Sequence, residues 1–213
     1  MSSEEILQEI ALEVSTCAKC KLCRTRKKAV PGEGSPSAKI LFIGEGPGYH
    51  EDQQARPFVG PAGQFLDELL ASIHLKRSDV FITNVVKCRP PSNRDPEPDE
   101  MAACNDYLDR QIEALQPEVI VTLGRFSMTK FFGAEKISAI HGRARKKDGR
   151  VCIAMYHPAA GLHQTSLKDV IRQDFQKIPL IIAEAERLAT EQPVKAIVQT
   201  KHEEEPPQQL SLF

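Results

Sequence analysis

The segment ILFIGEGPGYHEDQQARPFVG, residues 40–60, decides how the fold of this chain is interpreted. It opens with an apolar run of strand length, and a glycine-rich loop follows at once. Many phosphate-binding sites begin in this way. The loop contains no Gly-Lys-Ser/Thr sequence, however, and no helix-forming stretch is expected directly after it. The segment therefore predicts a buried strand and then a loop that serves something other than a nucleotide phosphate.

Apolar and amphipathic segments alternate on both sides of this strand. Buried strands are predicted at residues 39–44, 80–86 and 118–124, and a hairpin at 144–158 that turns at Asp148-Gly149. Helices are predicted at residues 3–15, 62–75, 101–116, 125–133 and 165–189, and Pro179 must kink or break the last of them. Continuously apolar strands that alternate with helices are typical of a three-layer α/β/α fold with a central, mainly parallel sheet.

Ligands bind to such folds at the carboxyl ends of the strands. Here those ends lead into residues 44–58, 84–93, 124 onward and 157–163. Three unusual residues lie in these segments: Asn84 inside an apolar run, His157 before a proline, and Phe58 in a polar loop. Each also has a purely structural interpretation, as a strand-capping amide, a structural histidine or a minor apolar contact. Together at one sheet edge they predict a pocket with a ring for stacking, an amide for reading an edge and an imidazole for polarising an oxygen.

The bulk properties set limits on the partners. A chain of 213 residues suits one domain, residues 1–189, with a polar tail at 190–213 that is expected to be disordered. The formal net charge of -1 does not indicate a nucleic-acid partner, so such a partner needs a local basic patch. No run approaches the ~18 apolar residues of a membrane span, and the acidic, amphipathic N-terminus is unlike a signal peptide. We expect a cytoplasmic, nucleoid-associated protein that binds no membrane.

The cysteines suggest a metal centre. Four of them, in Cys17-x2-Cys20 and Cys88-x15-Cys104, could supply four thiolates from two separate segments. Four thiolates suit zinc or an iron–sulfur cluster, and the spacing alone does not distinguish these. Cys23 could replace one ligand, and unliganded thiols are the bland alternative. The sixth cysteine, in an apolar strand at position 152, is expected to be a small core residue.

Several motifs in order resemble those of one known group. GEGPGYHEDQQARPFVGPAG, ITNVVKCRPPSNRDPEPDE and YHPAA, with the Cys-x2-Cys pair ahead of them, are similar to the family 4 uracil-DNA glycosylases over about residues 17–188. The resemblance implies an α/β/α glycosylase fold and a [4Fe–4S] cluster. Its ligands would be Cys17, Cys20, Cys88 and Cys104, and Cys23 lies outside the usual pattern. The implied partner is uracil-containing DNA, single- or double-stranded.

The resemblance also implies roles for the pocket residues. The enzyme would flip uracil out of DNA and hydrolyse its N-glycosidic bond, leaving an abasic site. Phe58 would stack on the base, Asn84 would accept from uracil N3–H and donate to O4, and His157 would donate to O2. The glycine loop would bring the attacking water close to the sugar.

The group that handles the water is less well defined. A backbone carbonyl at Gly46 is expected to position it. Glu45 and Glu51 are the nearby carboxylates that could assist, or shape the pocket against the methyl group of thymine.

Two further segments suggest contacts with DNA. The hairpin HGRARKKDGR carries a run of cations that would contact phosphates beside His157, the alternative being a solvated turn. These are Arg143, Arg145, Lys146 and Lys147, with Arg150 after the turn. The resemblance also implies that residues 159–166, after the histidine, wedge into the duplex, and Leu162 is the apolar candidate there.

The tail ends in QLSLF, with apolar residues that a disordered segment has no internal reason to carry. This pentapeptide resembles the motif with which bacterial DNA polymerases and repair proteins bind the sliding clamp. Its contact residues would be Gln209, Leu210, Leu212 and Phe213. We therefore expect a bacterial source and a clamp partner, with a chance apolar end or a strand packed on the domain as alternatives.

Three rival functions stay open at this point. One is a non-catalytic iron–sulfur or zinc module that binds DNA or protein, for which the three pocket residues have no use. Another is a nucleotide-binding protein that uses GEGPG, which the missing lysine and Ser/Thr disfavour. The third is a glycosylase with broadened specificity, for example towards hypoxanthine or thymine.

Overall fold

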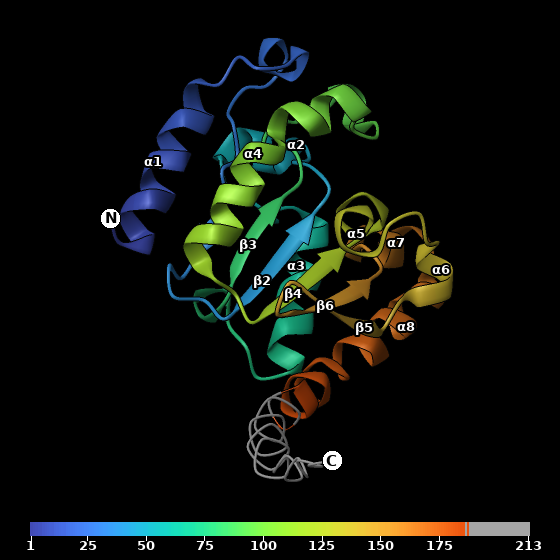
Figure 1. The fold of residues 1–213 in the computed structure, drawn as a ribbon. Coiled ribbons are helices and arrows are strands. Elements are labelled where there is room, and N and C mark those ends of the chain that lie inside the picture. The colour runs from blue at the N-terminus through green and yellow to red at the C-terminus, as the bar shows by residue number, and fades with distance from the viewer. Residues whose placement is uncertain (186, 188–213) are drawn as a thin grey trace, which may run out of the picture.

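The computed structural model describes residues 1–185 and 187 of the chain. Within them, one six-stranded sheet has the strand order β1-β3-β2-β4-β6-β5 (Figure 1). The strands are β1 (Glu33–Gly34), β2 (Ile40–Gly44), β3 (Phe81–Asn84), β4 (Val119–Leu123), β5 (Arg143–Lys147) and β6 (Arg150–Met155). The inner strands β3, β2, β4 and β6 are parallel, and β1 and β5 close the two edges in antiparallel pairs. The predicted mainly parallel sheet is confirmed.

Helices cover both faces of this sheet. They are α1 (Ser3–Thr16), α2 (Tyr49–Gln54), α3 (Pro61–Ser72), α4 (Pro98–Leu115), α5 (Arg125–Phe132), α6 (Ile137–Ile140), α7 (Pro158–His163) and α8 (Thr165–Phe175). Short 3-10 turns lie at Lys21–Arg24, Arg77–Asp79 and Pro91–Asn93. Side chains of α1, α4 and α5 pack in one core cluster, and those of α3 and α8 in another. On β2, Leu41 and Ile43 join the first cluster and Phe42 the second, so alternate side chains serve opposite faces. This is the predicted three-layer α/β/α arrangement.

The predicted break in the last helix is also present. Helix α8 ends at Phe175, a turn follows, and the chain is helical again from residue 178. Pro179 thus lies in the first turn of the second segment, where an amide N–H has no partner in the helix and its loss costs little.

Two short helices lie where loops were expected. Helix α2 follows the glycine loop directly, so the expectation of no helix there is wrong. A helix of six residues is unstable alone, and contacts with other segments stabilise it. The Asp52 carboxylate on α2 is buried and accepts a hydrogen bond from the backbone N–H of Lys27 at 2.8 Å. The second helix is α7, in which Pro158 occupies the first turn after a capping contact from His157.

Among the described residues, no helix is both long enough and apolar enough to span a bilayer.

Candidate active site

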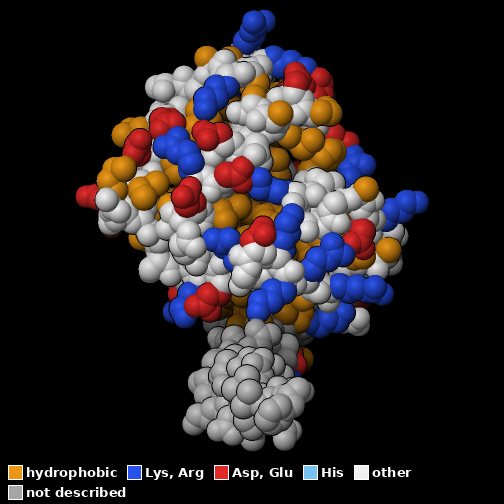
Figure 2. Space-filling view, viewed as in Figure 1, with side chains coloured by type: hydrophobic (Ala, Val, Ile, Leu, Met, Phe, Trp, Pro, Cys, Tyr) orange, Lys and Arg blue, Asp and Glu red, His pale blue; other side chains and the backbone are white. Residues whose placement is uncertain are grey.

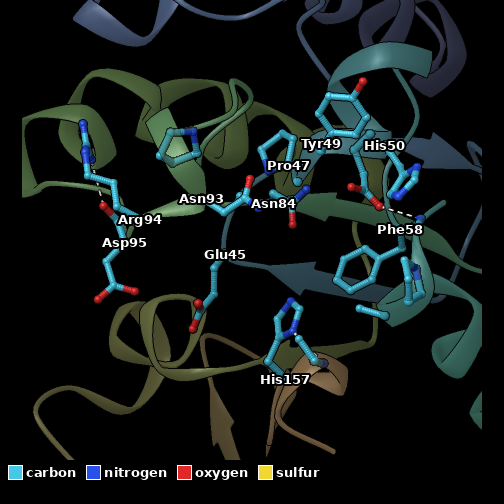
Figure 3. Close-up of a pocket in the computed structure, with 18 of the residues that line it drawn as sticks. Glu45, Pro47, Tyr49, His50, Phe58, Asn84, Asn93, Arg94, Asp95 and His157 are labelled. Atoms are coloured by element: carbon cyan, nitrogen blue, oxygen red, sulfur yellow. Dashed lines mark hydrogen bonds between the residues drawn. The ribbon is translucent and has the colours of Figure 1, made fainter. Parts of the chain in front are cut away.

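A cavity of about 600 Å³ opens at the carboxyl ends of the parallel strands (Figure 3). Its walls come from the segment after β2, the loop around Phe58, the segment after β3 and helix α7 after β6. Six residues predicted for the site line it: Glu45, Gly46, Glu51, Phe58, Asn84 and His157. The structure thus brings together residues that are more than a hundred positions apart in sequence, at the sheet edge that the fold predicts.

Phe58 and His157 form one end of the cavity. Their ring centroids are 5.4 Å apart and the planes differ by 25°, so the rings are stacked. Phe58 has a backbone φ of 53°, in the left-handed region that non-glycine residues rarely adopt. The Arg77 guanidinium holds this turn, since it donates to the backbone oxygens of Phe58 at 3.1 Å and Pro57 at 2.6 Å. The ring position is therefore built in and does not depend on a ligand.

Glu51 holds the other side of the same loop. Its Oε1 accepts hydrogen bonds from the backbone N–H groups of Val59 at 2.9 Å and Gly60 at 2.8 Å. The side chain is 9% exposed. This carboxylate oxygen is already engaged in positioning the wall that carries Phe58, which is a role that the sequence did not reveal.

Asn84 ends β3 and is 2% exposed. Its Oδ1 has no hydrogen-bond partner among the described residues. A Cβ added at Gly44 would lie 2.4 Å from this oxygen and 2.7 Å from Phe58 Cζ, so only glycine allows the two side chains to approach β2 here. A buried acceptor without a partner costs about 1–3 kcal/mol. The arrangement therefore suits a ligand that brings a donor to Asn84.

The His157 ring has a defined tautomer. Its Nδ1 accepts a hydrogen bond from the backbone N–H of Ala159 at 3.1 Å. A backbone N–H can only donate, so Nδ1 carries no proton and the neutral ring carries its proton on Nε2. Burial lowers the pKa of His157 to about 4. Near neutral pH the cavity thus contains an uncharged imidazole with one N–H available as a donor.

Glu45 directly follows β2, and its carboxyl group lies at the start of α5. Its Oε1 accepts from the backbone N–H of Phe126 at 3.3 Å, and burial raises the pKa of its carboxyl group. Gly124, which precedes the helix, has a φ of 96°, and a Cβ there would lie 2.4 Å from Glu45 Oε1. Gly124 therefore leaves the space that the Glu45 carboxylate occupies, and sequence reasoning did not identify it. Its only signal was a glycine between a strand and a helix.

Gly46 has a carbonyl free for a ligand. The backbone oxygens of Gly44 and Glu45 accept hydrogen bonds from Val85 and Val86 at 3.0 and 3.1 Å and so continue the pairing of β2 with β3. Within the described residues, the oxygen of Gly46 accepts none. A Cβ at Gly46 would lie 2.8 Å from Val86 Cγ2, so this position also requires glycine.

The predicted cysteine ligands line a second, small cavity between α1, the turn at Lys21–Arg24 and α4. Cys23 lies there too, together with Arg26, which donates to Cys88 Sγ at 3.0 Å. Burial raises the pKa of Cys88 to about 11 and also raises those of Cys20 and Cys104. Among the described residues, no group of three or more Cys, His, Asp or Glu could hold a metal ion. The remaining cysteine, at position 152, is buried in β6 as predicted.

A buried lysine bonds to residues in the walls of both cavities. Lys87 is 1% exposed, and its backbone N–H donates to Cys104 Sγ at 3.4 Å. Its Nζ donates to Thr83 Oγ1 at 2.7 Å, the Asn84 backbone oxygen at 2.8 Å and Gln111 Oε1 at 2.7 Å. Burial lowers the pKa of Lys87 to about 7. The residue links the strand that ends in Asn84 to the helix that carries Cys104.

The basic residues predicted to contact DNA form β5 and are all exposed: Arg143, Arg145, Lys146 and Lys147. The strand runs antiparallel to β6, so Arg143 lies opposite Ala154, close to the end that leads to His157. Lys147 lies opposite Arg150, at the far end of β6. Of the two ends of this hairpin, the one with Arg143 therefore lies nearer to His157, and the phosphate contacts stay a prediction. Figure 2 shows Lys and Arg side chains gathered towards the side of the molecule where Figure 1 places β5 and α8.

Leu162 lies on α7, lines the active-site cavity and is 43% exposed. The lining also includes residues that were not predicted, among them Tyr49, Asn93 and Asp95. The predicted clamp motif, residues 209–213, and the predicted disordered tail lie outside the described residues.

Comparison with known proteins gives a consistent result. Residues 31–178 match the family model of the uracil DNA glycosylase superfamily. The type-4 uracil-DNA glycosylase of Sulfurisphaera tokodaii is 48% identical over 81% of this chain and 83% of its own length. That of Archaeoglobus fulgidus is 48% identical over 82% of this chain and 92% of its own length. That of Thermotoga maritima is 42% identical over 82% of this chain and 93% of its own length.

Proposed function

The chain belongs to the uracil-DNA glycosylase superfamily and is a uracil-DNA glycosylase, and from this premise we propose how its cavity excises uracil. The observation that carries the proposal is that one cavity contains two features. One is the buried Asn84 Oδ1, which has no hydrogen-bond partner among the described residues, and the other is the stacked pair of rings of Phe58 and His157. The reaction is hydrolysis of the N-glycosidic bond of uracil in DNA.

Base recognition rests on Asn84 and Phe58. Asn84 Oδ1 accepts from uracil N3–H, its NH2 group donates to uracil O4, and the Phe58 ring stacks on the base. Cytosine presents an acceptor at N3 and a donor at N4, so it would leave buried polar groups unmatched. Such mismatches are heavily penalised in a closed site.

Leaving-group stabilisation is assigned to His157. Cleavage builds negative charge on uracil O2, and the N–H on Nε2 donates to it. The neutral tautomer supports this role because Nδ1 is held by Ala159, which leaves Nε2 as the donor. A preorganised donor at a developing anion is usually a large contribution to the rate.

The attacking water is assigned to the Gly46 carbonyl, with Glu45 assisting. The unpaired carbonyl oxygen of Gly46 supports this assignment. An oxocarbenium-like sugar needs little activation of the nucleophile, so a strong base is not required. Glu51 instead shapes the pocket wall through its bonds to Val59 and Gly60.

For the DNA, we assign phosphate contacts to Arg143 and its neighbours in β5, and the wedge to Leu162 on α7. Support comes from the exposure of these residues and from the position of Leu162 on the cavity wall.

A [4Fe–4S] cluster held by Cys17, Cys20, Cys88 and Cys104 is part of the proposal. All four cysteines line one small cavity, and four thiolates are the ligand set of such a cluster. In such a cluster each thiolate binds a different iron, so the sulfurs need not converge on one position, whereas a single zinc requires convergence. When bound, the cluster would supply a cross-link between the N-terminal segment, the segment after β3 and α4. Cys23 lies in the same cavity without being assigned as a ligand.

We also propose that QLSLF, residues 209–213, binds a bacterial sliding clamp and that the enzyme acts in the cytoplasm at the nucleoid. The support is the sequence of the motif itself. Both the clamp and the location are predictions to be tested.

The test of the function is incubation of the purified full chain with a uracil-containing oligonucleotide, followed by alkali to cut abasic sites. We expect cleavage at uracil and none at cytosine in a matched oligonucleotide. Hypoxanthine and thymine substrates in the same assay decide whether the specificity is broadened. Absence of cleavage at uracil by protein with its iron content intact would contradict the function and favour a non-catalytic module.

A further inference from the structure

Large exposed apolar side chains are few among the described residues, and two of them lie at the active-site cavity. The set is Met1, Leu12, Tyr49, Leu162 and Leu180, of which only Tyr49 and Leu162 line the cavity. Leu162 already has a role as the wedge. Tyr49 is 54% exposed and takes no part in uracil recognition as described above.

Tyr49 is held next to a cation. The guanidinium carbon of Arg89 lies 5.2 Å from the centroid of the Tyr49 ring. Arg89 Nε donates to Asn93 Oδ1 at 2.7 Å, and Asn93 also lines the cavity. The Tyr49 ring also contacts the His50 ring edge-on, with an angle of 84° between the two ring planes. The tyrosine is thus positioned by neighbours on two segments, although much of its surface faces solvent.

The charge of Arg89 is not neutralised within the described part of the chain. Two other arginines near the cavity are neutralised: Arg94 pairs with Glu100 at 2.6 Å, and Arg125 pairs with Asp95. Arg89 forms no ion pair with an acidic side chain of the described residues, and its hydrogen bond to Asn93 uses Nε. Its terminal nitrogens therefore remain available to an anion beside Tyr49.

An exposed aromatic ring beside an unneutralised arginine is suited to one kind of ligand, a nucleotide of single-stranded character. The ring offers a stacking surface to a base, and the guanidinium offers hydrogen bonds to its phosphate. Figure 3 shows Tyr49 next to His50, at the opposite side of the cavity from His157. A nucleotide bound there would be a neighbour of the uracil and could not be the uracil itself.

We propose that Tyr49 and Arg89 form a subsite for the nucleotide adjacent to the flipped uracil, with Tyr49 stacking on its base and Arg89 binding its phosphate. The inference rests on the proposed function, since it needs uracil in the cavity. The subsite is indifferent to sequence, because every base has a stacking face. It favours single-stranded or locally opened DNA, in which the neighbouring base is free to leave the duplex stack.

The test uses the full chain and an oligonucleotide with a single 2′-fluorinated deoxyuridine, which resists excision, flanked by the fluorescent base 2-aminopurine. Stacking on Tyr49 should quench the fluorescence on binding. Tyr49→Ala should reduce this quenching and lower the affinity for single-stranded DNA by about 5- to 100-fold, as expected for one lost base–aromatic stack. Tyr49→Phe should behave as wild type. Leu12→Ala, which removes an exposed apolar side chain remote from the cavity, is the matched control.

The phosphate contact is tested by the salt dependence of binding. Arg89→Gln should reduce the slope of log K against log salt concentration by about 0.7–0.9, the value for one phosphate. Lys39→Met removes a charge at the amino end of β2, the opposite sheet edge, and should leave the slope unchanged.

A measurement of excision separates the subsite from the chemistry. With ordinary deoxyuridine, Tyr49→Ala should keep the wild-type single-turnover rate at saturating DNA while its half-saturating concentration rises. Wild-type affinity in Tyr49→Ala would overturn the subsite, and so would a lowered saturated rate with unchanged affinity. Failure of the wild-type protein to excise uracil would count against the proposed function and is observed separately.

Discussion

At the scale of single residues, the site is built from groups whose free atoms are defined by what their other atoms already bind. Asn84 keeps an unpartnered Oδ1 because Gly44 leaves room beside it. His157 exposes Nε2 because Ala159 holds Nδ1. Gly46 keeps a free carbonyl because the pairing of β2 with β3 ends one residue earlier. In the proposed mechanism each of these free atoms has one task in uracil excision.

The first prediction concerns Asn84→Asp. A protonated aspartic acid can match the donor and acceptor of either base, whereas a carboxylate only accepts and cannot donate to uracil O4. We expect uracil excision to fall about 10- to 100-fold, in line with one unmatched buried group, and the uracil-to-cytosine ratio to fall with it. Single-turnover assays on paired oligonucleotides measure both. An unchanged ratio would mean that Asn84 does not read the base edge.

The second prediction concerns the protonation of His157. The folded-state pKa of about 4 is below the ordinary value of 6.5. The unfolded chain therefore binds the proton first as pH falls, and the stability that the neutral ring contributes is lost between about pH 6.5 and 4, by up to about 3 kcal/mol. The excision rate should show no inflection near pH 6.5.

Replacement of the ring provides the control for this titration. His157→Ala should flatten the dependence of unfolding free energy on pH in that window and cut single-turnover excision by about 10²–10³, with DNA affinity nearly unchanged. An inflection of the wild-type rate near pH 6.5 that His157→Ala removes would show a histidine that titrates near its ordinary pKa.

At the scale of elements, the junction of β4 with α5 controls Glu45. Gly124 has a positive φ and a Cβ there would meet the Glu45 carboxylate, while Gly133 at the other end of α5 has a φ of 75° and open space around it. Both glycines thus have a backbone conformation that would strain another residue, but only at Gly124 would an added Cβ also meet a side chain.

The third prediction uses this pair. Gly124→Ala and Gly133→Ala should each lose about 1–2 kcal/mol of unfolding free energy, because alanine is strained at positive φ. Only Gly124→Ala should also slow excision, since it displaces Glu45 from the N-terminus of α5. Thermal unfolding and single-turnover rates provide the comparison. Equal rates in the two variants would show that the position of Glu45 is not needed.

The fourth prediction concerns the elements around the cysteine cavity. Protein purified without oxygen should be yellow-brown and contain ~4 irons per chain. Cys88→Ala and Cys104→Ala should lose the iron and much of the fold, because they remove ligands from the segment after β3 and from α4.

Cys23→Ala is the matched control, since Cys23 lines the same cavity. It should keep both the iron and the fold. One zinc and no iron in the wild type would contradict the cluster, and loss of iron in Cys23→Ala would contradict the ligand assignment.

At the scale of the whole molecule, we propose that the glycosylase domain and the clamp motif serve separate functions on one chain. The tail would tether the enzyme at replicating DNA, where uracil is incorporated opposite adenine, and raise its effective concentration there. Among the described residues, those that line the active-site cavity all lie between Glu45 and His163.

The fifth prediction follows from this separation. A chain that ends at Gln208 should lose binding to the bacterial clamp in calorimetric titration and excise uracil from short oligonucleotides at the full-length rate. Equal clamp binding by both chains, or binding by neither, would remove the role of the tail.

The sequence by itself determined the layered fold and brought six of the lining residues to the pocket: Glu45, Gly46, Glu51, Phe58, Asn84 and His157. Hydrophobic periodicity is a local property, so strands, long helices and the break before Pro179 could be predicted from short windows of the chain. The three unusual residues Phe58, Asn84 and His157 could be assigned to one sheet edge because parallel strands align their carboxyl ends.

Only the tertiary structure decided which atoms remain free and which short elements form. Helix α2 is stabilised by a contact between Asp52 and Lys27. The position of Glu45 depends on the space left by Gly124. The direction of β5 relative to β6 carries Lys147 away from His157. These features arise from contacts between segments distant in sequence, and local patterns contain no information about such distances.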